Sequence, residues 1–157
     1  MYQLIRSVFF LFDAEKVHYF AMNALRLMCS IGFKRKFLAK IFRPKTNPVF
    51  VEKWGLTFSN PVGLAAGFDK NAQYLDVFKA LGFGHIEIGT VTPLGQEGNP
   101  KPRLFRLVED QAVINRMGFN NDGVDAIVER LKNRPKDLII GGNIGKNKVT
   151  PNEDAAS

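Results

Sequence analysis

The sequence predicts an α/β fold in which a parallel β/α barrel begins after a helical amino-terminal segment. Three apolar runs predict buried strands, and each run ends in small residues followed by a polar tip. Helical patterns separate the runs, and alternating strand and helix is typical of a parallel α/β barrel. The polar tips would meet at the carboxyl edge of the sheet, where such barrels place their active sites. The runs occupy residues 62–70, 85–90 and 138–146.

The amino-terminal segment predicts three helices. Residues 4–12 are apolar on nearly all sides, and residues 33–42 show a shorter helical pattern. Between them, Asp13 can cap a helix that runs to about Cys29. Apolar residues recur at helical spacing along this middle helix and form one stripe. They are Val17, Phe20, Ala21, Ala24, Leu27 and Met28.

Residues 43–48 are rich in turn residues and favour a domain boundary. We expect a small all-helical domain in residues 1–45 and the first part of the barrel in residues 46–157. The other predicted elements lie around the three barrel strands. They are a hairpin (49–53 with 56–58) at the bottom of the barrel, a helix ended by Gly82 (72–81), an inserted strand pair (104–108 with 112–115) and a helix (123–132).

The length of the chain does not suffice for a closed barrel. It has 157 residues, whereas a complete β/α barrel needs about 250. Residues 150–153 also predict a helix start, with a threonine cap, a proline in the first turn and a glutamate at the capping-box position. Only four residues follow this pattern. We therefore expect an amino-terminal fragment of a longer protein.

All the excess positive charge lies near the amino terminus. Residues 1–45 contain nine Lys or Arg against Asp13 and Glu15, which gives the whole net charge of +7. Seven of the fourteen phenylalanines lie there as well. Basic residues interleaved with Phe and Leu favour a helix on an anionic membrane surface. A solvated basic face is the alternative, and nucleic-acid binding is disfavoured because the segment matches none of the usual modules.

Two absences in the sequence constrain the membrane and redox interpretations. No uncharged apolar run approaches the roughly 18–20 residues needed to span a bilayer, and the run at residues 8–12 is too short for a signal-peptide core. We therefore expect peripheral membrane contact. Cys29 is the only cysteine, which excludes an intrachain disulfide and fits a reducing compartment. Its place in a helical pattern predicts a packed side chain.

The tip of the first barrel strand suggests a ligand site. Ala65, Ala66 and Gly67 carry little side-chain bulk, so a flat ligand can approach the backbone there. Lys70 would bring a positive charge to the edge of that ligand. The alternative is that Lys70 pairs with Asp69 on the surface.

Five blocks, in this order, resemble the dihydroorotate dehydrogenases, and more narrowly their quinone-dependent, membrane-associated class. The blocks are residues 60–70, 87–93, 101–106, 115–121 and 143–148. The resemblance covers nearly the whole chain, including the amino-terminal extension, and implies a (β/α)8 TIM barrel. Phe68 is a small departure, because leucine is frequent there in relatives.

The resemblance implies that FMN is the cofactor and that dihydroorotate is oxidised to orotate in de novo pyrimidine (UMP) biosynthesis. A cofactor is needed because no side chain accepts a hydride. No metal site is implied. The residues implied to contact FMN are Ala66, Gly67, Phe68, Asp69, Lys70, Thr90 and Asn143. For Asn143 the alternative is a cap on the loop after its strand.

Substrate residues also follow from the resemblance. Asn115 matches an asparagine that binds dihydroorotate, and an amide can pair with both C=O and N–H groups. Lys70 would serve substrate as well as flavin. The accompanying loop contains Arg116, Met117, Gly118 and Phe119. An ordinary turn at Gly118 and residues 120–121 is the alternative, and both interpretations are compatible.

The catalytic base of this class is a serine in a later loop, which we expect beyond Ser157. No catalytic residue is therefore expected within the chain, and the chain alone should not turn over substrate.

His18 and Arg106 match polar positions along the tunnel that leads a membrane quinone to the flavin in relatives. An amphipathic surface position is the alternative for His18. In a bacterium the resemblance implies a peripheral protein on the cytoplasmic face of the inner membrane. Two other functions remain open: a soluble FMN barrel enzyme of the same superfamily that uses fumarate or NAD, and a non-catalytic membrane-binding fragment. The basic, Phe-rich extension argues against the soluble enzyme.

Overall fold

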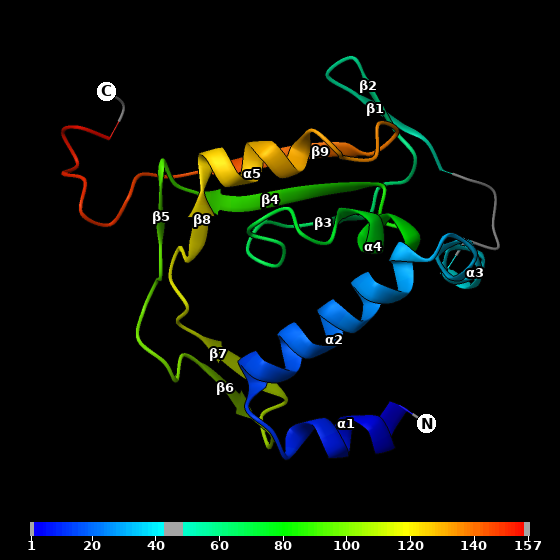
Figure 1. Ribbon diagram of the computed structural model, residues 1–157, viewed down its shortest axis with the longest axis horizontal. Helices are drawn as coiled ribbons and strands as arrows, with labels where there is room; N and C mark the ends of the chain where they lie inside the picture. Colours follow the sequence, from blue (N-terminus) through cyan, green and yellow to red (C-terminus); the bar gives the residue numbers. More distant parts are fainter. Residues whose placement is uncertain (1, 43–48, 156–157) are drawn as a thin grey trace.

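The computed structural model describes residues 2–42 and 49–155 and shows an α/β fold around a parallel sheet (Figure 1). The sheet has the order β3-β4-β9, with β3 at Gly63–Leu64, β4 at His85–Val91 and β9 at Ile139–Ile144. All three strands were predicted, and both pairings are parallel. Helices α4 (Leu75–Ala80) and α5 (Val124–Leu131) lie between successive strands in the chain. The carboxyl ends of the strands therefore meet at one edge, as the sequence predicts.

Three helices precede the sheet: α1 (Tyr2–Phe10), α2 (Ala14–Ser30) and α3 (Gly32–Phe42). The predicted cap on α2 is confirmed, because the Asp13 carboxylate accepts a hydrogen bond of 2.9 Å from the backbone N–H of Lys16. In Figure 1, α2 runs diagonally from the β6–β7 hairpin to α4, and it contacts both. The predicted boundary at residues 43–48 lies outside the described residues.

One hydrophobic core joins these helices to the sheet. Met22 and Cys29 of α2 pack in the same cluster as Phe78 of α4 and Ile86 of β4. Cys29 is 3% exposed, so the prediction of a packed side chain is confirmed. Helices α2 and α3 therefore depend on the sheet for part of their buried surface.

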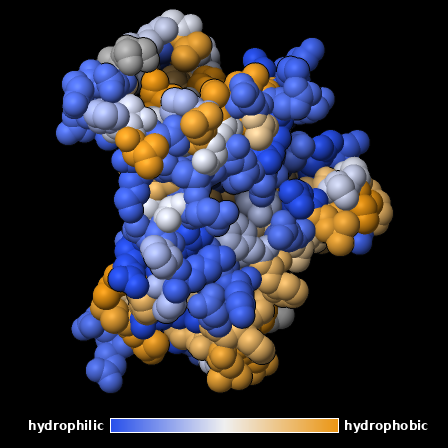
Figure 2. Space-filling model, turned by 60° about the vertical axis from the view of Figure 1, so that its left-hand side comes forward, coloured by the Kyte–Doolittle hydropathy of each residue, from blue (hydrophilic) through white to orange (hydrophobic). Residues whose placement is uncertain are grey.

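The outer faces of the amino-terminal helices carry exposed hydrophobic side chains. Phe33 and Phe37 of α3 are 71% and 66% exposed, and Phe20 of α2 is 65% exposed. Figure 2 shows hydrophobic surface at the lower end of the molecule, at the height of α1 in Figure 1. In the described residues, no helix is long and apolar enough to cross a bilayer.

Three antiparallel strand pairs accompany the parallel sheet. The predicted pairs are confirmed as β1 (Val51–Lys53) with β2 (Leu56–Phe58), and β6 (Leu104–Leu107) with β7 (Ala112–Asn115). A third antiparallel pair was not predicted and joins β5 (Leu94–Gln96) to β8 (Asn121–Gly123). This pair brings the segment after β4 beside the segment that precedes α5.

Two predicted helices differ from the structure. Helix α4 starts at Leu75 rather than near residue 72, because the buried Asp69 carboxylate accepts hydrogen bonds from the backbone N–H groups of Gln73 and Tyr74, both at 2.8 Å. The helix predicted to start at residues 150–153 is absent from the described chain, which ends at residue 155. A single turn forms there, with the Ala155 N–H 3.3 Å from the Asn152 carbonyl.

Candidate functional site

Lys70 connects the tip of β3 to the loop that follows β7. Its ammonium nitrogen Nζ donates hydrogen bonds to the Gly118 carbonyl at 2.7 Å and to Asn120 Oδ1 at 2.6 Å. Asp69 is 1% exposed, and its carboxylate accepts from backbone N–H groups at the start of α4. The alternative of a surface Lys70–Asp69 pair is therefore wrong. Asp69 shapes the turn, and Lys70 extends away from it toward the loop.

A cavity of about 200 Å³ lies beside Lys70, and we call it the Lys70 cavity. Its walls come from the β3 tip, from α2 and from the segment around Met117. It brings together residues that the sequence assigned to three separate roles. These are Gly67, Phe68, Asp69 and Lys70, then Asn115 and Met117, and also His18.

The backbone at Gly67 leaves open space beside this cavity. Its φ of +101° lies in the region that favours glycine, and an added Cβ would meet no heavy atom within 4 Å. The Gly67 N–H donates to the Gly89 carbonyl at 2.8 Å, which fixes the β3 tip against the end of β4. A flat ligand therefore has room to approach the backbone at this point.

Thr90 and Asn143 lie side by side at the carboxyl ends of β4 and β9. The Thr90 hydroxyl donates to Asn143 Oδ1 at 2.6 Å, and Asn143 Nδ2 donates to Glu87 Oε1 at 3.3 Å. Asn143 thus connects two strands, and the alternative of a cap on its own loop is wrong. Neither Thr90 nor Asn143 lines the Lys70 cavity.

The side chains at the end of β7 and in the loop after it point into different surroundings. Asn115 Oδ1 accepts from the Met117 N–H at 3.0 Å, and both residues line the Lys70 cavity. Arg116 extends elsewhere and donates to the Pro102 carbonyl at 3.1 Å. Phe119 lines a neighbouring cavity of about 610 Å³. The loop is therefore a turn that also presents Asn115 toward Lys70, so the two interpretations of the sequence coexist.

The two predicted tunnel residues do not share a cavity. His18 of α2 is half-buried in the Lys70 cavity, with its ring 4.9 Å from the Phe68 ring between centroids, and burial lowers the pKa of His18. Arg106 of β6 donates to the Phe12 carbonyl at 2.7 Å and lies over the Phe10 ring. An apolar cavity of about 590 Å³ between α1 and α2 is lined by neither residue.

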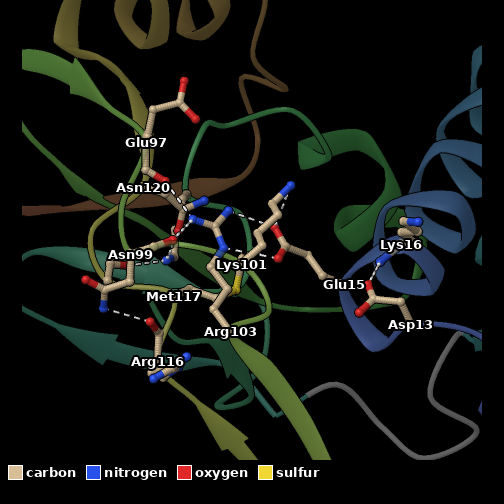
Figure 3. Close-up of polar contacts among 12 residues, drawn as sticks. Asp13, Glu15, Lys16, Glu97, Asn99, Lys101, Arg103, Arg116, Met117 and Asn120 are labelled. Atoms are coloured by element: carbon tan, nitrogen blue, oxygen red, sulfur yellow. Dashed lines mark hydrogen bonds and ion pairs between the residues drawn. The ribbon is translucent and has the colours of Figure 1, made fainter.

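A buried ion pair beside the Lys70 cavity was not predicted. Arg103 Nη2 lies 2.7 Å from Glu15 Oε1, and Arg103 Nε donates to Glu15 Oε2 at 3.1 Å (Figure 3). Both residues are at most 6% exposed. The hydrogen bond from Arg103 holds the pKa of Glu15 below its usual value. The partners are 88 residues apart in sequence, so no local pattern indicates the pair.

A second unpredicted feature is a buried polar network at the carboxyl edge of β4. The Thr92 hydroxyl donates to the Leu94 carbonyl at 2.6 Å and accepts from Asn121 Nδ2 at 2.9 Å and from Asn147 Nδ2 at 3.2 Å. All three polar residues are at most 6% exposed. The network joins the segments that follow β4 and β9 to the start of β8, and so fixes the loops at this edge.

Comparisons with known proteins agree with the geometry. Residues 49–157 match the sequence model of the family described as "Dihydroorotate dehydrogenase". A Christiangramia forsetii protein named dihydroorotate dehydrogenase (quinone) is 57% identical over 97% of this chain and 44% of its own length. A Neisseria meningitidis protein of the same name is 51% identical over 99% of this chain and 44% of its own length.

Among solved structures, DHODH from Eimeria tenella in complex with ferulenol is 41% identical and superposes with a TM-score of 0.68. That match covers 90% of this chain and 39% of the crystallised one. The chain therefore spans less than half the length of the relatives it matches, and it belongs to the dihydroorotate dehydrogenase family.

Proposed function

We propose that the full-length protein oxidises dihydroorotate to orotate in pyrimidine synthesis, with FMN as cofactor and a membrane quinone as electron acceptor. In this proposal the chain supplies the amino-terminal helices and the first strands of the barrel. The observation that carries the proposal is the position of Lys70. Its ammonium lies at a strand tip, in a cavity shared with Asn115 and with α2.

The residues at the strand tips fit one edge of an FMN ring. Gly67 leaves open space for a flat ring, and Thr90 and Asn143 place hydroxyl and amide groups on the two neighbouring strand ends. Bound FMN would supply the hydride acceptor that side chains lack. The residues proposed to contact it are Ala66, Gly67, Phe68, Asp69, Lys70, Thr90 and Asn143.

Lys70 and Asn115 are proposed to bind the substrate. Dihydroorotate carries a carboxylate and ring amide groups, so it can pair with an ammonium and with a side-chain amide. Met117, which is buried, and the Gly118 carbonyl, which accepts from Lys70, would keep this wall of the cavity in place. Arg116 and Phe119 face other surroundings and would act by fixing the loop.

A membrane quinone is proposed to enter along the amino-terminal helices. The apolar cavity between α1 and α2 and the half-buried His18 lie on that side of the molecule, and Arg106 joins β6 to the same helices. The exposed phenylalanines and the charge of residues 1–45 favour peripheral contact with an anionic surface. Relatives named for quinone, rather than for fumarate or NAD, favour this acceptor over the soluble alternative.

The proposed function is tested with the purified full-length protein, dihydroorotate and a short-chain quinone. We expect orotate to form with quinone and not with fumarate or NAD, and we expect residues 1–157 alone to be inactive. Turnover with NAD or fumarate in place of quinone would favour the soluble alternative. Turnover by residues 1–157 alone would show that no catalytic base from a later segment is needed.

Membrane contact predicts a specific role for the exposed face of α3. Replacing both Phe33 and Phe37 with serine should weaken binding of the full-length protein to anionic vesicles by at least about 10²-fold, because each buried phenylalanine contributes about 1.5–3 kcal/mol. Vesicle co-sedimentation measures the change. Deletion of residues 1–45 is a less specific experiment, because α2 and α3 pack in one core with the sheet and their loss would also disturb the fold.

A matched control for this pair lies on α5. Val124 and Val128 are also exposed apolar residues on a helix, at 40% and 49%, so their double replacement by serine should leave vesicle binding unchanged. Equal losses from the two double variants would argue against a docking surface on α3.

A further inference from the structure

Glu15 and Arg103 connect the amino-terminal helices to the Lys70 cavity through a two-point ion pair. Glu15 lies in the first turn of α2 and lines the cavity, as does His18 one turn later on the same helix. Arg103 lies just before β6, at the start of the inserted strand pair. Two parallel N–H···O contacts at 2.7 Å and 3.1 Å fix both the distance and the orientation of the two side chains.

The same guanidinium also fixes a turn of the backbone. Arg103 Nη1 donates to the Glu97 carbonyl at 2.6 Å and to the Asn99 carbonyl at 3.0 Å. All three nitrogens of one planar group are therefore engaged, two by α2 and one by the turn at residues 97–99 (Figure 3). A lysine has a single nitrogen and cannot make this set of contacts.

The turn at residues 97–99 also fixes the loop to which Lys70 binds. The Asn99 N–H donates to the Met117 carbonyl at 2.9 Å, and Asn99 Nδ2 donates to the Arg116 carbonyl at 2.8 Å. The Arg116 N–H donates back to the Arg103 carbonyl at 3.0 Å. The next carbonyl after Met117, that of Gly118, accepts from Lys70. The contacts form a continuous path from α2 to the Lys70 ammonium.

Arg103 and Glu15 also affect Lys70 through their charges. Burial is the main cause that lowers the pKa of Lys70, Arg103 lowers it further, and Glu15 opposes them. Glu15 also has a second cation beside it, Lys101, whose Nζ lies 3.6 Å from Glu15 Oε1 and whose side chain is 69% exposed. Removing the Glu15 charge would therefore leave Lys70 facing an uncompensated Arg103.

We propose that Arg103, oriented by Glu15, is a positioning residue that sets the distance between α2 and the loop at residues 115–118 and thereby the place of the Lys70 ammonium. The proposal rests on the proposed function, in which Lys70 binds dihydroorotate. It goes beyond that function by making the geometry of the substrate site depend on the amino-terminal helix. An ion pair that only stabilises the fold would not have this effect.

The test uses full-length, FMN-loaded protein with Arg103→Lys, which retains the charge and removes the three-way contact. Steady-state oxidation of dihydroorotate is measured with an artificial acceptor, so that the measured rate does not depend on the access of quinone. A displacement of reacting groups by about 1 Å can cost about 10²-fold in rate. We therefore expect a fall of about 10²-fold in kcat/KM, mostly as a raised KM for dihydroorotate, with FMN content unchanged.

Glu15→Gln is the second variant, because it keeps nearly the same shape, removes the charge and leaves only one of the two oxygen acceptors for Arg103. We expect a smaller loss of kcat/KM and a shift of the alkaline limb of its pH profile to lower pH, since the charge that favours protonated Lys70 is gone. The matched control is Asp76→Asn. It removes an exposed ion pair of 3.1 Å with Arg35 that also joins an amino-terminal helix to α4, so it should leave KM and the pH profile unchanged.

Hydrogen exchange of the Asn99 and Arg116 amides gives a readout that does not depend on activity. Both amides should exchange at least about tenfold faster in Arg103→Lys, while amides of β4 stay protected. A lowered melting temperature with unchanged KM, pH profile and exchange at these two amides would overturn the proposal.

Should the wild-type protein fail to oxidise dihydroorotate, the proposed function falls, and the exchange data alone then decide whether Arg103 positions the loop. If Arg103→Lys does not fold, Glu15→Gln decides by the same measurements.

Discussion

Lys70→Ala is expected to slow dihydroorotate oxidation by the full-length protein by about 10²–10³-fold, the usual effect of removing one fixed electrostatic donor. Among the described residues that line the cavity, Lys70 is the only lysine or arginine. Its ammonium also donates to Gly118 and Asn120, so the variant loses both a charge and a support of the loop. Stopped-flow measurement of the reductive half-reaction, with FMN content determined in parallel, gives the result.

Two further variants separate these contributions. Lys70→Gln retains a hydrogen-bond donor near Gly118 and lacks the charge, so a loss as large as that of Lys70→Ala assigns the effect to charge. Lys79→Ala removes an exposed lysine that pairs with Asp137 and should leave the rate unchanged. A near wild-type rate for Lys70→Ala with full FMN content would show that Lys70 only supports the loop.

Local patterns predicted most of the fold, because the relevant signals lie within a few residues of one another. The Asp13 cap, the presence of α2 and the short strands all follow from residues that are close in sequence. The face of α2 that packs on the core was not predicted, because Met22 and Cys29 are buried there, whereas Phe20 and Leu27 of the predicted stripe are 65% and 70% exposed. The pairing of β5 with β8 did not, since it depends on a contact between Gln96 and Asn121 across the loop region. The late start of α4 was also missed, because it depends on where the buried Asp69 carboxylate finds its donors.

The same distinction applies to the site. The β3 tip and the loop at residues 115–118 were both singled out from sequence, and the structure brings them together at Lys70. Which side chains of the loop face the cavity was not predictable, because Arg116 donates to the Pro102 carbonyl and Phe119 lines a different cavity, together with residues of β5. The Glu15–Arg103 pair depends on the packing of α2 against β6, and no periodic pattern in the sequence indicates it.

Gly89→Ala is expected to be the most destabilising single change at the sheet. Gly89 has φ +103°, and an added Cβ would lie 2.3 Å from the Asn143 carbonyl oxygen and 2.8 Å from the Val91 nitrogen. Both neighbours are backbone atoms of strands, so neither can move without disturbing the pairing of β4 with β9. Overpacking of this kind costs about 1–3 kcal/mol, and a non-glycine residue in such a conformation costs a further 1–3 kcal/mol or so.

Urea unfolding followed by circular dichroism measures this loss as a lower midpoint of the transition. Gly142→Ala is the matched control, because Gly142 lies opposite Ile88 in the same strand pair and an added Cβ there meets nothing within 4 Å. We expect Gly142→Ala to unfold at or slightly above the wild-type midpoint, since alanine reduces the entropy of the unfolded chain. Equal midpoints for the two variants would mean that β4 and β9 do not approach as closely at Gly89 as the structure shows. The neighbouring Thr90–Asn143 hydrogen bond depends on that approach, so a destabilised Gly89→Ala variant should also bind FMN more weakly in the full-length protein.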